Sequence, residues 1–170
     1  MIDPGGATER GGALPVTVRR FRDDDAEALC EIFFRSVREV APARYDDAQV
    51  RSWAPTVPDV NRWRPRMREF DTFVAVRDDD VPVGWIALDG AYVDMLYCAP
   101  EAAGRGVAAR LYAAAEAVAR ERGFTRLTAE CSQFAESFLG KHGWVVDDYE
   151  VIARDGVEIP RARMSKTLIP

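Results

Sequence analysis

The short stretch from Gly104 to Ala108, Gly-Arg-Gly-Val-Ala, is suited to binding an anion through its backbone. It follows an apolar run and leads into a segment with helical periodicity, so it is predicted to join a strand to the start of a helix. The N–H groups of a first helical turn lack partners within the helix and favour phosphate, which can approach closely where side chains are small. A plain tight turn is the alternative, because one Gly-x-Gly is weak evidence by itself.

The segments before this loop predict a strand, two helices and an irregular stretch. Alternation over residues 15–21 predicts a strand, and the apolar spacing over 22–40 predicts an amphipathic helix behind an aspartate N-cap. A second short helix is predicted from Asp46 to about Trp53. Residues 54–70 contain three prolines and are expected to be irregular or weakly helical.

The rest of the chain predicts a mixed sheet. Strand character, with turn signals between the first three runs, occurs at residues 72–77, 82–88, 91–99, 125–131, 144–152 and 161–168. Helices are predicted at 106–122 and 133–142. The strand, helix, strand unit that contains the loop needs a crossover, so its two strands should be parallel in an otherwise antiparallel sheet.

Length and composition predict one globular domain over residues 15–170, after a leader at 1–14 that we expect to be disordered. No apolar run is long enough to cross a membrane and no signal peptide is recognisable, so a cytoplasmic protein without a membrane partner is expected. The net charge of −5 argues against a nucleic-acid partner, since phosphate contacts need clustered Lys and Arg.

The cysteines and the single histidine make a metal site or disulfide framework a poor interpretation. Cys30, Cys98 and Cys131 are odd in number and lie in apolar patterns, which is typical of buried free thiols. His142 is the only histidine. No metal is therefore expected.

The segments DMLYCAPEAAGRGVAARLYAAAEAVARERGFTRL and FAESFLGKHGW resemble the GNAT superfamily of acyl-CoA-dependent N-acyltransferases. The resemblance implies an α/β (α+β) fold with a mixed, mostly antiparallel central sheet, helices on both faces and a splayed pair of parallel strands. The family's phosphate loop has Gln or Arg, two residues, Gly, any residue, then Gly or Ala. These positions fall on Ala103, Gly106 and Ala108, so the first one departs from the pattern.

The same resemblance implies acetyl-CoA as the cosubstrate. Its pantetheine arm would lie between the splayed strands and pair with backbone, and its pyrophosphate would bind at the glycine loop. Ser132 takes the place of an asparagine that bonds the pantetheine in many relatives. The implied cofactor-binding residues are Leu96, Tyr97, Cys98, Gly104, Arg105, Gly106, Val107, Ala108, Ala109 and Ser132.

Direct attack on the thioester in a ternary complex needs a neutral amine, and an alkylamine is protonated at pH 7. A carboxylate near the splayed strands is the usual base. Glu130, on the strand that would flank the thioester, is the first candidate, and Asp94 on the opposing strand is the second. An ordinary solvent-facing acid is the alternative for each.

The leaving thiolate is often protonated in this family by a tyrosine, and Leu139 occupies that position here. A thiol with a pKa near 8.5 can leave as thiolate, and water or Tyr97 could supply the proton afterwards. Because Ala103 and Leu139 both depart from the pattern, a non-catalytic acyl-CoA sensor or interaction module stays open as a second function.

The acceptor pocket of this family lies between the early helices and the last hairpin. Tyr45 and Trp53 are the candidate acceptor-binding residues, because aromatic walls near the acidic pair Asp46 and Asp47 suit an organic cation. The same residues could equally form core. The acceptor is expected to be a small-molecule or peptide amine, and a homodimer is left open.

Overall fold

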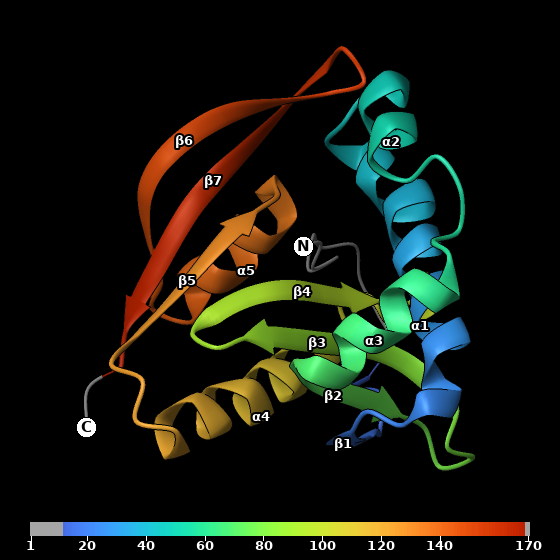
Figure 1. Ribbon diagram of the computed structural model, residues 1–170, viewed down its shortest axis with the longest axis vertical. Coiled ribbons are helices and arrows are strands. Elements are labelled where there is room, and N and C mark those ends of the chain that lie inside the picture. Colours follow the sequence, from blue (N-terminus) through green and yellow to red (C-terminus); the bar gives the residue numbers. More distant parts are fainter. Residues whose placement is uncertain (1–11, 169–170) are drawn as a thin grey trace.

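A computed structural model describes residues 12–168 as a single sheet flanked by helices (Figure 1). Seven strands follow the order β1-β2-β3-β4-β5-β7-β6, and all neighbours are antiparallel except β4 and β5. Their bounds are Thr17–Arg20 (β1), Asp71–Val76 (β2), Pro82–Asp89 (β3), Tyr92–Cys98 (β4), Arg126–Cys131 (β5), Val145–Arg154 (β6) and Val157–Thr167 (β7). The predicted mixed, mostly antiparallel sheet is confirmed.

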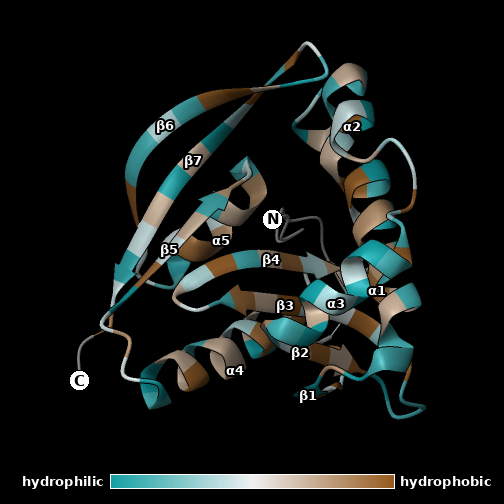
Figure 2. Ribbon diagram, viewed as in Figure 1, coloured by the Kyte–Doolittle hydropathy of each residue, from teal (hydrophilic) through white to brown (hydrophobic). Residues whose placement is uncertain are grey.

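Helices cover both faces of the sheet, as predicted. They are α1 (Ala26–Arg35), α2 (Asp47–Trp53), α3 (Val60–Glu69), α4 (Val107–Glu121) and α5 (Gln133–Lys141). On one face the backbone of Gly84 in β3 lies under α4, and on the other face the next residue, Trp85, packs against Trp63 of α3. Figure 2 shows the apolar residues concentrated on the inner strands, and every residue of β2 is buried.

Residues 54–70 were expected to be irregular or weakly helical, but they contain α3, a regular ten-residue helix. The Asp59 side chain caps it by accepting a hydrogen bond from the N–H of Asn61. Pro65 lies inside the helix and removes only one backbone donor, while Met67 is buried in the core and Trp63 packs against Phe33. Tertiary packing therefore outweighs the helix-breaking effect of proline.

Two further boundaries differ from the predictions. The helix expected over residues 22–40 is divided into a 3₁₀ turn (Asp23–Asp25), α1, a π-helical turn (Ser36–Val40) and, beyond it, another 3₁₀ turn (Ala41–Ala43). The last hairpin is longer than predicted, because β6 and β7 continue to a turn at Asp155 and Gly156, both with positive φ. A part of the predicted leader, residues 1–11, lies outside the described residues.

The parallel strands β4 and β5 pair only where they begin. Tyr92 is opposite Thr128, whose N–H donates to the carbonyl of Ala91 at 3.0 Å. Beyond this point the two strands diverge, as Figure 1 shows. A β-bulge at Asp94, between the pairs Ala87–Met95 and Leu88–Val93, redirects β4 just past the paired end. The predicted splayed pair is confirmed.

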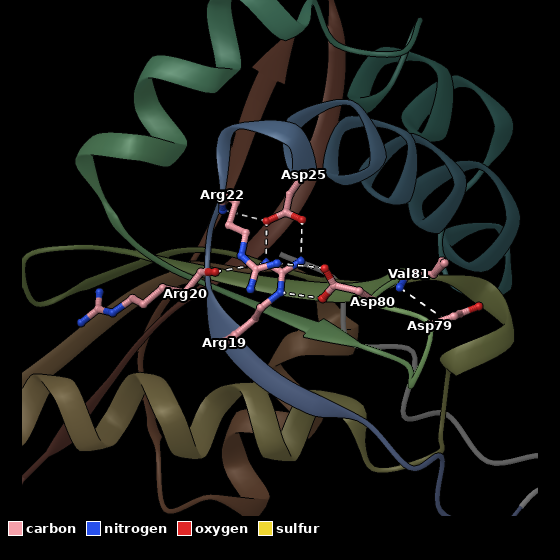
Figure 3. Close-up of polar contacts among 7 residues, drawn as sticks. All are labelled: Arg19, Arg20, Arg22, Asp25, Asp79, Asp80 and Val81. Atoms are coloured by element: carbon pink, nitrogen blue, oxygen red, sulfur yellow. Dashed lines mark hydrogen bonds and ion pairs between the residues drawn. The ribbon is translucent and has the colours of Figure 1, made fainter.

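A cluster of charged side chains fastens β1 to the start of α1 and to the turn between β2 and β3 (Figure 3). Arg19 donates to both carboxylate oxygens of the buried Asp25 at 2.8 Å, and its Nε donates to Asp80 at 2.9 Å. These hydrogen bonds, Asp25 first, raise the pKa of Arg19. Arg22 donates to the second oxygen of Asp80. The cluster fixes where α1 begins.

A second polar network joins α4 to β7 at the paired end of β4 and β5. Glu116 accepts a hydrogen bond from Lys166 Nζ at 2.6 Å and another from the Tyr112 hydroxyl, which accepts one from Trp144 Nε1 at 2.9 Å. Burial by itself would raise the pKa of Glu116, but these donors and Arg120 lower it to about 2. The folded protein thus favours the ionised form of the Glu116 carboxylate.

We expect Glu116→Gln to lower the free energy of unfolding at pH 7 by about 1–3 kcal/mol, the cost of a lost charge-assisted hydrogen bond. The folded pKa lies below the unfolded value of about 4.3, so this stabilisation is present above pH 4.3 and is lost as the pH falls towards 2. Urea unfolding of both proteins at several pH values between 7 and 2 measures the difference in free energy of unfolding. Glu121→Gln, at an exposed position on the same helix, should change little. A difference that is constant over this pH range would contradict the assignment.

Candidate active site

A cavity of about 950 Å³ opens between the early helices, the splayed strands and the hairpin of β6 and β7. Residues predicted for different roles line it together, namely Tyr45, Trp53, Asp94, Tyr97, Glu130 and Ser132. The fold therefore brings both candidate bases and both candidate acceptor-binding residues to one space. The glycine loop is not part of this lining; it follows the C-terminal end of β4 and leads into α4.

The glycine loop has the backbone that only glycine adopts easily. Gly104 has φ 67° and Gly106 has φ 82°, and Gly106 is the residue that immediately precedes α4. Among residues 12–168, no atom lies within 4 Å of a Cβ added to either glycine. The two glycines are therefore required by the turn and not by packing, and the space above the first turn of α4 is open for a ligand.

Gly84 in β3 sets how closely α4 approaches the sheet, and sequence reasoning missed it. A Cβ on this residue would lie 3.1 Å from the side chains of Cys98 and Val107, and 3.2 Å from Leu111. The first turn of α4 thus packs directly over β3 and the end of β4. A glycine inside a strand pattern is a signal for such close approach.

The predicted pantetheine-binding segment is the last part of β4. Leu96, Tyr97 and Cys98 are buried and pair with β3 on one side, while on the other side β4 has already separated from β5. Ser132, at the end of β5, is buried and caps α5 by accepting a hydrogen bond from the N–H of Ala135. Its hydroxyl thus has a structural role in addition to its position on the cavity wall.

Asp94 and Glu130 are each paired with an arginine that the sequence did not identify. Asp94, in the bulge of β4, accepts hydrogen bonds from Arg66 Nη2 at 2.8 Å on both oxygens. Glu130 forms an ion pair with Arg161, whose Nη1 lies 2.7 Å from a carboxylate oxygen. The Asp94 side chain is 13% exposed and that of Glu130 is 37% exposed. Burial raises the pKa of Asp94 more than Arg66 lowers it, which makes Asp94 a stronger base than a solvated aspartate.

Two tyrosines lie close to these carboxylates. Burial, followed by the charges of Glu130 and Asp94, raises the pKa of Tyr92 to about 12, so its hydroxyl stays protonated. Complete burial raises the pKa of Tyr97, and a hydrogen bond with the side chain of Trp53 opposes that shift only in part. Tyr97 was considered as a proton source, whereas Tyr92 was missed because nothing in its sequence context marks it.

Aromatic side chains form one wall of the cavity. The ring centroids of Tyr45 and Trp53 are 5.6 Å apart, and Phe33 lies 4.9 Å from Tyr97. Tyr45 is buried, and its hydroxyl accepts a hydrogen bond from the N–H of Gln133 at the start of α5. Tyr45 therefore belongs both to the core and to the cavity wall.

The cysteines are buried free thiols, as predicted. Burial raises the pKa of Cys131 to about 12 and that of Cys30 to about 11. A thiol with such a pKa is a poor nucleophile at neutral pH, which argues against either of these two cysteines as an acyl carrier.

Comparison with known proteins agrees with the geometry of the loop and the splayed strands. Residues 41–168 match the acetyltransferase (GNAT) domain family. The N-acetyltransferase YafP of Escherichia coli, which is uncharacterised, is 31% identical over 76% of this chain and 81% of its own length. The peptidyl-lysine N-acetyltransferase YjaB of the same bacterium is 31% identical over 78% of this chain and 84% of its own.

Solved structures share the fold over nearly the whole chain. The GCN5-related N-acetyltransferase of Rhodopseudomonas palustris has a TM-score of 0.85 and 29% identity, and the match covers 95% of this chain and 100% of that one. Other structures of this fold, 18% to 19% identical with TM-scores of 0.70 to 0.73, contain coenzyme A or acetyl-CoA. This chain belongs to the GNAT family of acetyl-CoA-dependent N-acetyltransferases.

Proposed function

We propose that the protein transfers the acetyl group of acetyl-CoA directly to an amine held in the 950 Å³ cavity, within a ternary complex. Acetyl transfer to an amine follows from the family. The observation that carries the proposal for this chain is the divergence of β4 and β5, which connects the open glycine loop at α4 to the cavity that holds the carboxylates. The non-catalytic alternative gains no support from the relatives.

The cofactor would lie along this divergence. Its pyrophosphate would accept hydrogen bonds from the N–H groups at the start of α4, in the space that Gly104 and Gly106 leave open. Its pantetheine would pair with the backbone of Leu96, Tyr97 and Cys98, which β5 has left. Arg105 lies at this loop, where its Nε donates to the carbonyl of Gly12 at 3.3 Å.

Glu130 and Asp94 are the proposed bases, and each suits the role in a different way. Glu130 is the more accessible carboxylate and lies on the strand that would flank the thioester. Asp94 is the more desolvated one, with a raised pKa, and it also binds Arg66 with both oxygens. The protonated amine of the acceptor would lose a proton to Glu130, directly or through a water, and the neutral amine would then attack the thioester, while Asp94 and its arginine hold β4 in place.

Protonation of the thiolate does not require a residue at position 139. Leu139 is fully buried and cannot donate a proton. The hydroxyls of Tyr92 and Tyr97 line the cavity and stay protonated, so either could donate a hydrogen bond to the departing thiolate. With a pKa near 8.5 the thiolate can leave as such and take its proton from water.

The acceptor site would use the aromatic wall formed by Tyr45 and Trp53. The name of YjaB supports an amine on a peptide, and the cavity volume also suits a small amine. Among residues 12–168 no helix is long and apolar enough to cross a membrane. A cytoplasmic location and a homodimer stay proposals, the first supported by the three free thiols.

The placement of the pyrophosphate predicts that Gly106→Glu abolishes stabilisation by acetyl-CoA. The new carboxylate would occupy the open space above α4 and repel the phosphates. Thermal unfolding with and without acetyl-CoA measures the shift in Tm.

Gly123→Glu is the matched control, because Gly123 follows the other end of α4 and also has a positive φ, of 78°, and an added Cβ would meet no other atom of the described residues within 4 Å. Both variants should lose intrinsic stability, but only Gly106→Glu should lose the response to acetyl-CoA. An unchanged shift in Gly106→Glu would place the pyrophosphate elsewhere.

The role of the base predicts that Glu130→Gln retains acetyl-CoA binding and lowers kcat/KM for the amine by roughly 10²- to 10⁴-fold. Steady-state thiol release over a range of pH measures this, and the acidic limb of the profile should disappear. Asp94→Asn should have a smaller effect.

Asp148→Asn is a suitable control, since Asp148 also pairs with an arginine of β7, Arg163, at 2.6 Å, but lies outside the 950 Å³ cavity. Near-normal rates in Glu130→Gln and Asp94→Asn would exclude a carboxylate base. A larger loss in Asp94→Asn would move the base to β4.

A further inference from the structure

Two of the four arginines that line the 950 Å³ cavity have no carboxylate partner within residues 12–168. Arg66 and Arg161 are paired with the candidate bases, whereas Arg154 and Arg62 form no ion pair. A guanidinium on the wall of a cavity, without a counter-ion, is suited to bind an anionic group of a ligand.

Arg154 is held in position by the end of α2. Its Nη1 donates to the carbonyl of Trp53 at 3.1 Å, and its own carbonyl accepts a hydrogen bond from the Ser52 hydroxyl at 2.8 Å. Arg154 and Tyr97 both line the cavity, and the charge of Arg154 opposes part of the rise that burial causes in the pKa of Tyr97. Its Nε and Nη2 donate to no group within the described chain. The side chain is thus oriented but retains free donors.

Arg62 lies in the first turn of α3, where a positive charge is unfavourable to the helix dipole. It is exposed at the cavity, and the first turn contains no acidic residue to offset it. The nearest acid along the chain that also lines the cavity, Asp59, uses its side chain to cap the N–H of Asn61. A local stabilising role does not account for the charge of Arg62.

Building on the proposed function, we propose that the acceptor is a small amino-acid-like zwitterion whose carboxylate binds Arg154 and Arg62 while its amine faces Glu130. The carboxylate would take the free donors of Arg154, and the aromatic wall at Trp53 would contact the carbon chain between the two charges. The lining as a whole contains four arginines and four carboxylates, those of Asp59, Asp94, Glu130 and Asp155, so the cavity suits a ligand without net charge. Neither Arg62 nor Arg154 forms an ion pair with one of these carboxylates. A volume of about 950 Å³ is at the upper end of small-molecule sites.

The competing explanation for Arg154 is a helix cap. Trp53 is the last residue of α2, and a cation that binds its carbonyl stabilises the end of the helix. If Arg154 is only a cap, replacing it should lower stability and change kcat/KM equally for all acceptors. If it binds an anion, replacing it should lower kcat/KM only for acceptors that carry a carboxylate. Acceptors matched in every respect except charge therefore separate the two explanations.

The test compares glycine, 4-aminobutanoate and 6-aminohexanoate with their carboxamides, and includes a lysine peptide with blocked ends. Thiol release with acetyl-CoA gives kcat/KM, and calorimetry in the presence of CoA gives acceptor affinity where turnover is slow. For at least one pair, kcat/KM or affinity should be about tenfold or more higher for the acid than for its amide. Arg154→Gln should lower kcat/KM or affinity for that acid by about 10- to 100-fold and change the same quantity for the amide less than twofold. Arg62→Gln should act in the same direction, and Arg51→Gln, an exposed α2 position outside the cavity lining, should leave the ratio unchanged.

Equal use of acids and amides by the native protein would overturn the proposal, as would the blocked peptide being the best acceptor. Equal losses for acid and amide in Arg154→Gln would assign Arg154 to the cap, and if that variant does not fold, Arg62→Gln decides. Failure of the proposed function itself would be recognised separately, because no amine, including the peptide, would then release thiol and acetyl-CoA would not raise Tm.

Discussion

The fold depends on the separation of two parallel strands that begin as neighbours. After the single pair of Tyr92 and Thr128, β4 and β5 diverge, and their backbone groups no longer bond to each other. Buried backbone polar groups need partners, so the gap is suited to a ligand that can pair like a strand. A cofactor with amide groups in an extended arm satisfies this requirement. The separated edges thus explain how the proposed binding segment of β4 can have ordinary apolar side chains.

The separation is stable because polar contacts hold the two halves of the sheet around it. At the paired end, Glu116 of α4 binds Lys166 of β7, which joins the half that contains β1 to β4 with the half that contains β5 to β7. Within the cavity, Arg66 of α3 binds Asp94 and Arg161 of β7 binds Glu130. The groups that could act as base are therefore also those that tie the surrounding elements to the open strands.

Much of the fold could be predicted because its signals are local. Alternation and helical spacing identified the strands and most helices, and the glycine loop marked the start of α4. The helix α3 was underestimated because its stability comes from the packing of Trp63 and Met67, which a proline-rich sequence conceals. The arginine partners of the carboxylates and the position of Tyr92 depend on contacts between distant elements, for which a single sequence has no signal.

Hydrogen exchange of the backbone amides with and without acetyl-CoA tests the central claim, that the gap between β4 and β5 receives the cofactor. The structure predicts slower exchange on binding at residues 95–98 of β4 and at residues 104–109 of the loop and α4, with β1 and β2 unchanged. If acetyl-CoA slowed exchange elsewhere and left exchange unchanged in residues 95–98 and also in residues 104–109, the result would contradict the claim.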